Sequence, residues 1–445
     1  MLGLTALFGG VGLAAFEPTR RSQDPVSYAL RILLAGGIDP EIAAFYRDRD
    51  YRPLWVFDGR LLPGANALLK ALSEAVDDNL NPHSYGATAL SAAVTAADLG
   101  DLMALARLDL RLSRAAATWA NDLRRPNKAA AMLFVDADLP MPGDHRGAYL
   151  SALSRAPYLE DALTDLRRMH PVYEALRAEG LQQRKSQNVT IQRLVYANLE
   201  RARSLPPAEG RHVIVDVAAQ VLEMWEGGAP VDRMPVVVGA PKQPTPTMAG
   251  LIRYMVLRPY WHMPHDLAAA RIAPVVIRDG AWVLARRGLE VLSDFSSEAK
   301  VLDPGSIDWA AVGAGREKVH LRQQPGPRNM MGAAKFIFPN DQGIYLHDTP
   351  MKGLFNANYR AGSAGCVRVA DAARLANWLV GGELDLMAPG DPETILSLTK
   401  PIPVYLIYLT VRATPAGVDR RVDIYGRDPL LLGASDDEAS GLKLT

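Results

Sequence analysis

This chain of 445 residues has little cysteine, no net charge and no long apolar run. Its single cysteine, Cys366, can form no internal disulfide, and metal sites built from several cysteines are excluded. The formal net charge is zero and no basic cluster interleaves with aromatic residues, which argues against a nucleic-acid partner. The chain instead has 49% hydrophobic and 22% charged residues, a composition typical of a soluble globular protein with two or three domains.

The most apolar N-terminal stretch covers residues 2–16 and is too short to span a bilayer comfortably. Its length suits the core of a signal peptide, and small residues near Gly12 and Ala14 would suit cleavage. No lysine or arginine precedes it, so a retained anchor and an ordinary N-terminal helix stay open as alternatives. We predict a signal peptide or anchor over residues 1–22, and therefore export.

Residues 23–186 have the pattern of a helical domain. Apolar residues recur three and four positions apart in 25–36, 64–78 and 102–123. A further helix is predicted over 191–205, ending before two prolines. Its apolar face comprises Ile191, Leu194, Val195, Leu199 and Ala202.

After this helix the sequence pattern changes to short, valine-rich segments typical of strands. Strands are predicted over 212–225, 234–240, 252–257, 334–340, 343–348, 402–413 and 422–426, with a helix over 369–380. The fold class is therefore α+β, with a helical N-terminal domain followed by a mostly β domain over 187–430. Residues 264–320 form a long insertion of the kind that often acts as a lid. The tail, 431–445, is predicted to be disordered.

Cys366 lies in a turn with the features of a reactive thiol. Arg360 and Arg368 flank it and would favour the thiolate, which is the nucleophilic form. Gly362 and Gly365 allow a sharp turn that brings backbone N–H groups close to a developing oxyanion.

His347 lies nineteen residues before Cys366 and follows an apolar run, which predicts a position at a strand end. There it could act as a base, with its second ring nitrogen held by a backbone carbonyl or by Asp348. The helix predicted over 369–380 would add the positive end of its dipole. A buried, unreactive thiol stays open as the alternative. His262, His265 and His320 lack a metal-ligand spacing with a carboxylate, so neither metal nor cofactor is expected.

The segment "YLHDTPMKGLFNANYRAGSAGCVRV", residues 345–369, resembles the active-site signature of the L,D-transpeptidases of bacterial peptidoglycan. The segments "NLERARSLP", "VVVGAPKQPTP", "RPYWHMP", "QQPGPRNMMGAAKFIFPN" and "DIYG" follow in the order used by the large periplasmic branch. In the helical half "FYRDRDYRPLW" and "NLNPHSYG" are similar too, but more weakly.

The resemblance implies Cys366 as nucleophile and His347 as base. It also implies an oxyanion hole formed by the N–H groups of Gly365 and Cys366, helped by the Tyr345 hydroxyl. The residues implied to brace the loop or meet substrate are Arg360, Ser363, Arg368 and Trp261. For Tyr345 and Trp261 a role as core aromatics stays open, and for Arg368 a role as a structural strut.

The implied function is a periplasmic cysteine transpeptidase that cross-links peptidoglycan stem peptides, as a 3-3 link or as a 1-3 link from an L-Ala donor. A carbapenem would acylate the same cysteine. An L,D-carboxypeptidase or endopeptidase, or a non-catalytic wall-binding scaffold, are the alternatives. Members of this branch commonly insert a peptidoglycan-binding module, but only residues 178–190 separate the neighbouring segments here. The resemblance therefore implies a member without that module.

Overall fold

The computed structural model describes residues 24–36, 39–97, 100–141 and 143–433. The predicted leader, 1–22, and residues 434–445 of the predicted tail lie outside the described residues. The chain divides into two compact units. Unit 1 comprises 1–73, 83–118 and 145–163, and unit 2 comprises 74–82, 119–144 and 164–445.

Unit 1 is helical. Its elements are α1 (Pro25–Ala35), α2 (Pro40–Asp48), the short strands β1 (Val56–Phe57) and β2 (Arg60–Leu61), α3 (Gly64–Ser73), η2 (Pro82–Tyr85) from His83 on, α4 (Ala87–Thr95), α5 (Leu102–Leu123) up to Thr118, α6 (Arg146–Arg155) and α7 (Leu159–Arg167) up to Leu163. The Asp24 side chain accepts a hydrogen bond from the Val26 N–H and caps α1, while Pro25 occupies its first turn. Asp39 and Pro40 start α2 in the same way.

A buried carboxylate joins the long helix of unit 1 to the segment after α2. Asp109 on α5 is fully buried and accepts hydrogen bonds from the N–H groups of Leu54 (3.0 Å) and Trp55 (2.7 Å). The Tyr46 hydroxyl also donates to it. Tyr46 and Trp55 both belong to "FYRDRDYRPLW", so this motif contributes the partners of a buried anchor in unit 1.

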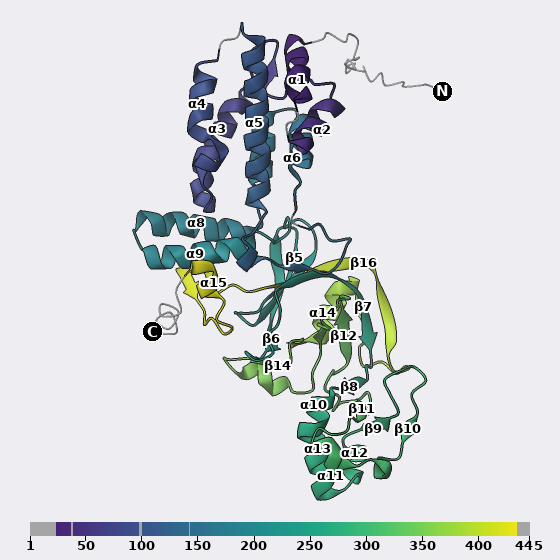
Figure 1. Ribbon diagram of the computed structural model, residues 1–445. Helices are drawn as coiled ribbons and strands as arrows, with labels where there is room; N and C mark the ends of the chain where they lie inside the picture. The colour runs from purple at the N-terminus through teal and green to yellow at the C-terminus, as the bar shows by residue number, and fades with distance from the viewer. Residues whose placement is uncertain (1–23, 37–38, 98–99, 142, 434–445) are drawn as a thin grey trace, which may run out of the picture. The chain divides into compact units, whose positions relative to one another are not determined.

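Unit 2 begins with η1 (Glu74–Asp78), η3 (Lys128–Ala130) and two long helices, α8 (Pro171–Lys185) and α9 (Val189–Ala202). The helices α8 and α9 run side by side (Figure 1). The prediction of a helix ending before Pro206 is confirmed, because α9 ends at Ala202. Its buried face includes Leu194, Val195, Leu199 and Ala202.

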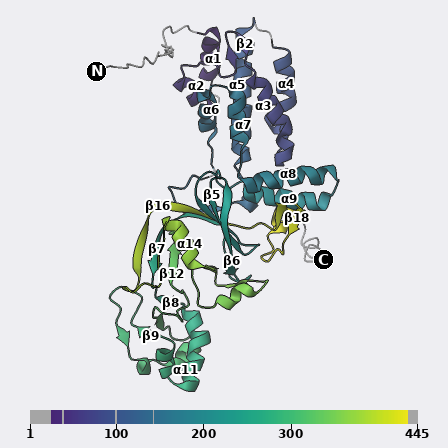
Figure 2. The ribbon, with the colours of Figure 1, turned by 180° about the vertical axis from the view of Figure 1, so that it is seen from behind.

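The centre of unit 2 is a ten-stranded sheet. Its strands are β3 (Leu133–Phe134), β4 (His212–Asp216), β5 (Val221–Glu226), β6 (Ala229–Gly239), β7 (Met248–Leu257), β12 (Ala334–Ile337), β13 (Leu346–His347), β14 (Ala361–Ser363), β15 (Val367–Val369) and β16 (Thr394–Ile407). They pair in the order β12-β13-β15-β6-β5-β4-β16-β7-β3, with β14 beside β6. Pairing of β12 with β7 closes this order into a ring, and Figure 2 shows β7 next to β16.

The C-terminal half of β16 is buried on both faces of the sheet. On β16, Val404 and Leu406 enter one core, which includes the apolar face of α14 (Ala372–Val380). The alternate residues Tyr405 and Ile407 enter a second core with α8 and α9. Because successive side chains point to opposite faces, a strand buried on both reads as a continuous apolar run.

A capping subdomain with its own apolar core follows β7. It comprises β8 (Trp261–Met263), α10 (His265–Leu267), η4 (Ala268–Ile272), α11 (Ala273–Asp279), α12 (Trp282–Arg286), β9 (Leu289–Leu292), β10 (Val301–Leu302), η5 (Pro304–Ser306), α13 (Trp309–Gly313) and β11 (His320–Gln323). The four strands pair in the order β10-β9-β11-β8. Residues 264–320, predicted as a lid-like insertion, fall inside this subdomain.

Two local predictions are wrong. The predicted strand 422–426 is a turn that follows the hairpin β17 (Val411–Thr414) and β18 (Gly417–Arg420) and leads into α15 (Asp428–Leu432). Asp423 accepts from the N–H groups of Arg427 and Asp428, which turns the chain away from an extended path. The predicted helix over 369–380 begins only at Ala372.

Strand β15 and the residues after it separate Cys366 from that helix. The positive end of the α14 dipole therefore lies about 10 Å or more along the chain from the thiol, at about 3.3 Å per extended residue. Cys366 therefore lies outside the first turn of α14, where helix-dipole effects are strongest.

Among the described residues, no helix combines the length and hydropathy required to cross a membrane.

Candidate active site

Strand register gathers the predicted chemical groups on one face of the sheet. His347 on β13 pairs with Arg368 on the parallel strand β15, and with Lys335 on the antiparallel strand β12. The same register sets Tyr345 beside Cys366, one residue before each strand. Paired residues project from the same face, and residues two apart along a strand share it. These five residues are called the polar face below; Leu346 and Val367, between them, point into the core.

His347 is 2% exposed and is held as a neutral imidazole. Its Nδ1 lies 2.6 Å from the backbone oxygen of Asp348, so Nδ1 carries the proton and Nε2 keeps its lone pair. Burial, followed by the charge of Arg368, lowers the pKa of His347 to about 3. The sequence left a backbone carbonyl or the Asp348 side chain as partner. The structure has the carbonyl, because the Asp348 carboxylate binds the Lys352 ammonium (2.6 Å) and the Ala333 N–H (2.8 Å).

The Cys366 thiol is half-buried and points its hydrogen toward the Gly343 carbonyl at 3.5 Å. Within the described residues no hydrogen bond joins it to His347. Burial raises the pKa of the Cys366 thiol, while the N–H and hydroxyl of Tyr345 and the charge of Arg368 oppose this rise. The resting site thus holds a thiol and a neutral base, and proton transfer must accompany attack.

The pH dependence of thiol alkylation tests this resting state. Because the pKa of Cys366 is raised and the pKa of His347 is lowered, the reaction rate with iodoacetamide is expected to climb from about pH 6 to about pH 9 without a plateau. Cys366 is the only cysteine, so mass addition reports on it alone. Removing the Tyr345 hydroxyl with Tyr345→Phe should shift the curve to still higher pH. A plateau starting below about pH 6 would instead indicate a thiolate–imidazolium pair.

The turn that carries the thiol depends on Gly365. Its φ of +109° is a conformation that L side chains rarely adopt, and an added Cβ would lie 3.1 Å from Ile344. The Ser363 hydroxyl donates to the Cys366 carbonyl and accepts the Gly365 N–H at 3.2 Å. Of the two N–H groups implied for an oxyanion hole, that of Gly365 is therefore engaged inside the turn, and Ser363 braces the turn.

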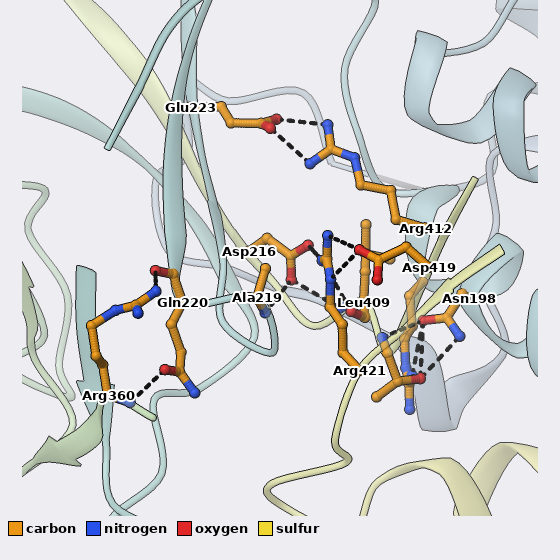
Figure 3. A network of polar contacts seen from close by, with 12 residues as sticks. Asn198, Asp216, Ala219, Gln220, Glu223, Arg360, Leu409, Arg412, Asp419 and Arg421 are labelled. Atoms are coloured by element: carbon orange, nitrogen blue, oxygen red, sulfur yellow. Dashed lines mark hydrogen bonds and ion pairs between the residues drawn. The ribbon is translucent and has the colours of Figure 1, made fainter. Parts of the chain in front are cut away.

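Arg360 lies where β14 begins and is tied to backbone carbonyls. Its Nη1 donates to Ala357 (2.7 Å), its Nη2 to Gln220 (3.0 Å) and its Nε to Val236 (3.2 Å). The Gln220 side chain, 4% exposed, accepts the Arg360 N–H in return (Figure 3). Gln220 has a positive φ of 57° in the turn after β4, a detail that gives no signal in the sequence. Arg360 thus fixes the strand leading to Cys366.

Arg368 differs from Arg360. Its Nε is buried without a hydrogen-bond partner among the described residues. Burial lowers its pKa, and the charge of Arg271 in the capping subdomain lowers it further. A half-buried guanidinium whose Nε has no hydrogen-bond partner among the described residues is suited to a carboxylate ligand.

Sequence reasoning missed a buried threonine behind the nucleophile turn. Thr245 is fully buried in the loop between β6 and β7. Its hydroxyl donates to the Gly365 carbonyl (2.8 Å) and accepts the Gly239 N–H (2.8 Å). The Tyr425 hydroxyl donates to the Gly239 carbonyl (2.7 Å) and accepts the Thr245 N–H (3.1 Å). Thr245 and Tyr425 lie in "VVVGAPKQPTP" and "DIYG", two motifs whose purpose the sequence did not reveal.

Thr245→Val should reveal this support, since valine keeps the shape but cannot bond Gly239 or Gly365. We expect stability to fall by about 1–3 kcal/mol and kcat to fall by up to about 10²-fold through displacement of Cys366. KM should change little, because the Thr245 side chain is fully buried and its hydroxyl bonds backbone groups. Thr245→Ser, which keeps the hydroxyl, should restore most of kcat. Equal kcat in the valine and wild-type enzymes would contradict the role.

Trp261 lies on β8 and lines a cavity in the capping subdomain. The groups on the polar face are a thiol, an imidazole, a phenol and two cations, and among the described residues no cluster of histidine, cysteine and carboxylate side chains could hold a metal ion. This set can perform nucleophilic acyl transfer at a carbonyl.

A closed, mostly β domain presenting a thiol and a neutral histidine is thus a candidate acyl-transfer domain. Residues 210–403 match the family model described as the L,D-transpeptidase catalytic domain, YkuD, and residues 40–179 match one described as a scaffold domain. The family comparison thus assigns an L,D-transpeptidase catalytic domain of the YkuD type to residues 210–403, less than half of the chain.

Other known proteins are similar to parts of this chain. A Haemophilus influenzae protein named "Putative L,D-transpeptidase" is 26% identical over 397 residues, covering 87% of this chain and 78% of that protein. Two solved structures are also similar to part of this chain. One is an L,D-transpeptidase in complex with imipenem (14% identity, TM-score 0.22), and the other is an L,D-transpeptidase from Mycobacterium smegmatis (18% identity, TM-score 0.21). Each covers 44% of this chain, which spans 58% and 59% of their respective lengths.

Proposed function

We propose that this protein is a periplasmic L,D-transpeptidase that cross-links peptidoglycan stem peptides through an acyl-enzyme on Cys366. The observation that carries the proposal is the register of β13 and β15, which sets a neutral His347 and Cys366 on one face. The match to the catalytic-domain model supports the reaction class. A periplasmic location is proposed from the substrate, which lies outside the cytoplasmic membrane.

In the first step His347 Nε2 takes the thiol proton as Cys366 Sγ attacks the carbonyl of an L-residue in the donor stem. The C–N bond to the following residue breaks, the leaving amine receives the proton from His347, and a thioester remains. The Cys366 N–H, which has no hydrogen-bond partner among the described residues, and the Tyr345 hydroxyl are the proposed donors to the oxyanion. Arg368 is the proposed partner of a substrate carboxylate.

In the second step the side-chain amine of an acceptor stem attacks the thioester. His347 accepts a proton from that amine and returns one to the thiolate as the new amide forms. The link is 3-3 when the donor carbonyl is that of the third residue, and 1-3 when it is that of L-Ala. Water in place of the amine would give an L,D-carboxypeptidase or endopeptidase, the other proposed outcome.

Incubation with purified muropeptides tests the proposal. Tetrapeptide and dipeptide donors are supplied separately with an amine-bearing acceptor, and the products are resolved by mass. Dimers in which the donor carbonyl is joined to the acceptor amine support transfer. Dimers formed from the tetrapeptide donor indicate a 3-3 link, and dimers formed from the dipeptide donor indicate a 1-3 link. Shortened monomers without dimers would identify a hydrolase, while unchanged substrates with no mass added to Cys366 would refute both.

A further inference from the structure

The capping subdomain contains a cavity that the reaction chemistry on the polar face does not use. It has a volume of about 580 Å³, within the range of about 300–1,000 Å³ typical of ligand sites. Its apolar part is formed by residues from β8, η4, α11, α12 and β9, among them Trp261 and Trp282.

The charged lining of this cavity is almost all of one sign. Among the described residues it contains Arg271, Arg286, Arg287 and Arg328, and a single carboxylate, that of Asp279. Within the described part of the chain no hydrogen bond or ion pair engages these four guanidinium groups. Asp279 is paired with Arg278, which does not line the cavity, by two hydrogen bonds (2.8 and 2.7 Å), and the charge of Arg287 also lowers the pKa of Asp279.

None of the five polar-face residues lines the cavity, but two contacts link it to them. Met330 lines it, and the next residue, Met331, places its sulfur 3.6 Å from the Tyr345 hydroxyl. Arg271 lies close enough to Arg368 to lower the pKa of that guanidinium. Arg271 therefore connects the cationic lining of the cavity to Arg368 on the polar face.

We propose that this arginine-lined cavity binds the free carboxylates of the stem peptide, so that the enzyme selects acidic stems over amidated ones. Guanidinium groups pair with carboxylates through two parallel hydrogen bonds, whereas a carboxamide offers no charge and only one acceptor oxygen. The apolar lining and the two tryptophans accommodate the aliphatic parts of the same peptide. The inference rests on the proposed function and adds to it the charge state of the substrate.

The test measures binding by calorimetry to the full-length Cys366→Ala protein, which cannot turn over. The probes are a stem tetrapeptide with free internal carboxylates and the same peptide with these groups amidated. We expect the free acid to bind about tenfold more tightly, equivalent to one charged hydrogen bond. In the Arg271→Gln/Arg286→Gln background the two peptides should bind equally. Raising the salt concentration should reduce the preference.

Arg316→Gln is the matched control, because Arg316 is exposed in the same subdomain and does not line the cavity. It should leave the preference for the free acid intact. Equal binding of both peptides to the Cys366→Ala protein, or an undiminished preference after removal of Arg271 and Arg286, would overturn the inference. Failure of the proposed function would give a different result. The binding preference for the free acid would then persist, but the wild-type enzyme would form no thioester with either peptide.

Discussion

Cys366→Ala is expected to abolish cross-linking, with a loss of on the order of 10⁴-fold or more because no other nucleophile replaces the thiol. The other polar-face groups are a phenol, a neutral imidazole and two cations, and Ser363 is engaged within the turn. Carbapenem treatment should add mass to the wild-type protein and none to the variant. Since the chain has one cysteine, the added mass can be assigned without mapping.

His347→Gln is the companion change, because it keeps a side chain that can hydrogen-bond but removes the base. We expect a loss of about 10²–10⁴-fold in the acylation rate. Raising the pH should recover part of this loss, since hydroxide can then generate the thiolate. Circular dichroism and thermal unfolding of both variants should match those of the wild type. Dimer formation by a folded Cys366→Ala protein would rule out the acyl-enzyme.

Asp109→Ala is expected to lower the stability of unit 1 by about 3–5 kcal/mol, as for other buried groups that lose their charged partner. The substitution leaves the N–H groups of Leu54 and Trp55 and the Tyr46 hydroxyl without their shared acceptor. Hydrogen exchange followed by mass spectrometry should show faster exchange in the peptide containing residues 54 and 55. Asp48→Ala, which removes an exposed carboxylate of α2, should change nothing there. Unaltered exchange in the Asp109 variant would contradict the anchor.

The same carboxylate gives unit 1 a pH dependence. Burial raises the pKa of Asp109 to about 6, above the value of about 3.9 expected in the unfolded chain. The folded state therefore holds more protons between these values, and the stability contributed by Asp109 rises as pH falls from about 6 to about 4. Against Asp109→Asn, which cannot titrate, the wild-type protein should gain stability over this interval. A constant difference between the two proteins would refute the shifted pKa.

Local sequence patterns predicted the structure correctly where the pattern came from a single helix or strand. The periodicity of residues 191–205 predicted α9, and the run "GIYL" placed His347 at the end of β13. It failed where a side chain reshaped the backbone. Tyr425 lies in a segment that contains valine and isoleucine and resembles a strand. The Asp423 side chain, however, accepts hydrogen bonds from the N–H groups of Arg427 and Asp428, just after this segment, and turns the chain. Because those partners follow the segment, its own pattern held no sign of the turn.

The hydrogen bonds that stabilise the nucleophile turn could not be predicted from the sequence, for a different reason. Thr245 is 120 residues from Gly365 along the chain, and Gln220 is 140 residues from Arg360. Hydrogen bonds over such separations exist only after β6 has paired with β14 and β15. A threonine in a proline-rich loop and a glutamine in a turn have no periodicity or spacing that indicates these partners.

The sequence by itself determined the α+β class, the valine-rich strands and the identity of the residues resembling a cysteine acyl-transfer signature, because these follow from local pattern and residue type. Only the tertiary structure decided how these residues act together. There the Asp348 carbonyl, not the carboxylate, is the partner of His347, and Arg360 is bound to backbone carbonyls. The Nε of Arg368 has no hydrogen-bond partner in the described part of the chain. Strand register and burial decide such matters, since both depend on residues far apart in the chain.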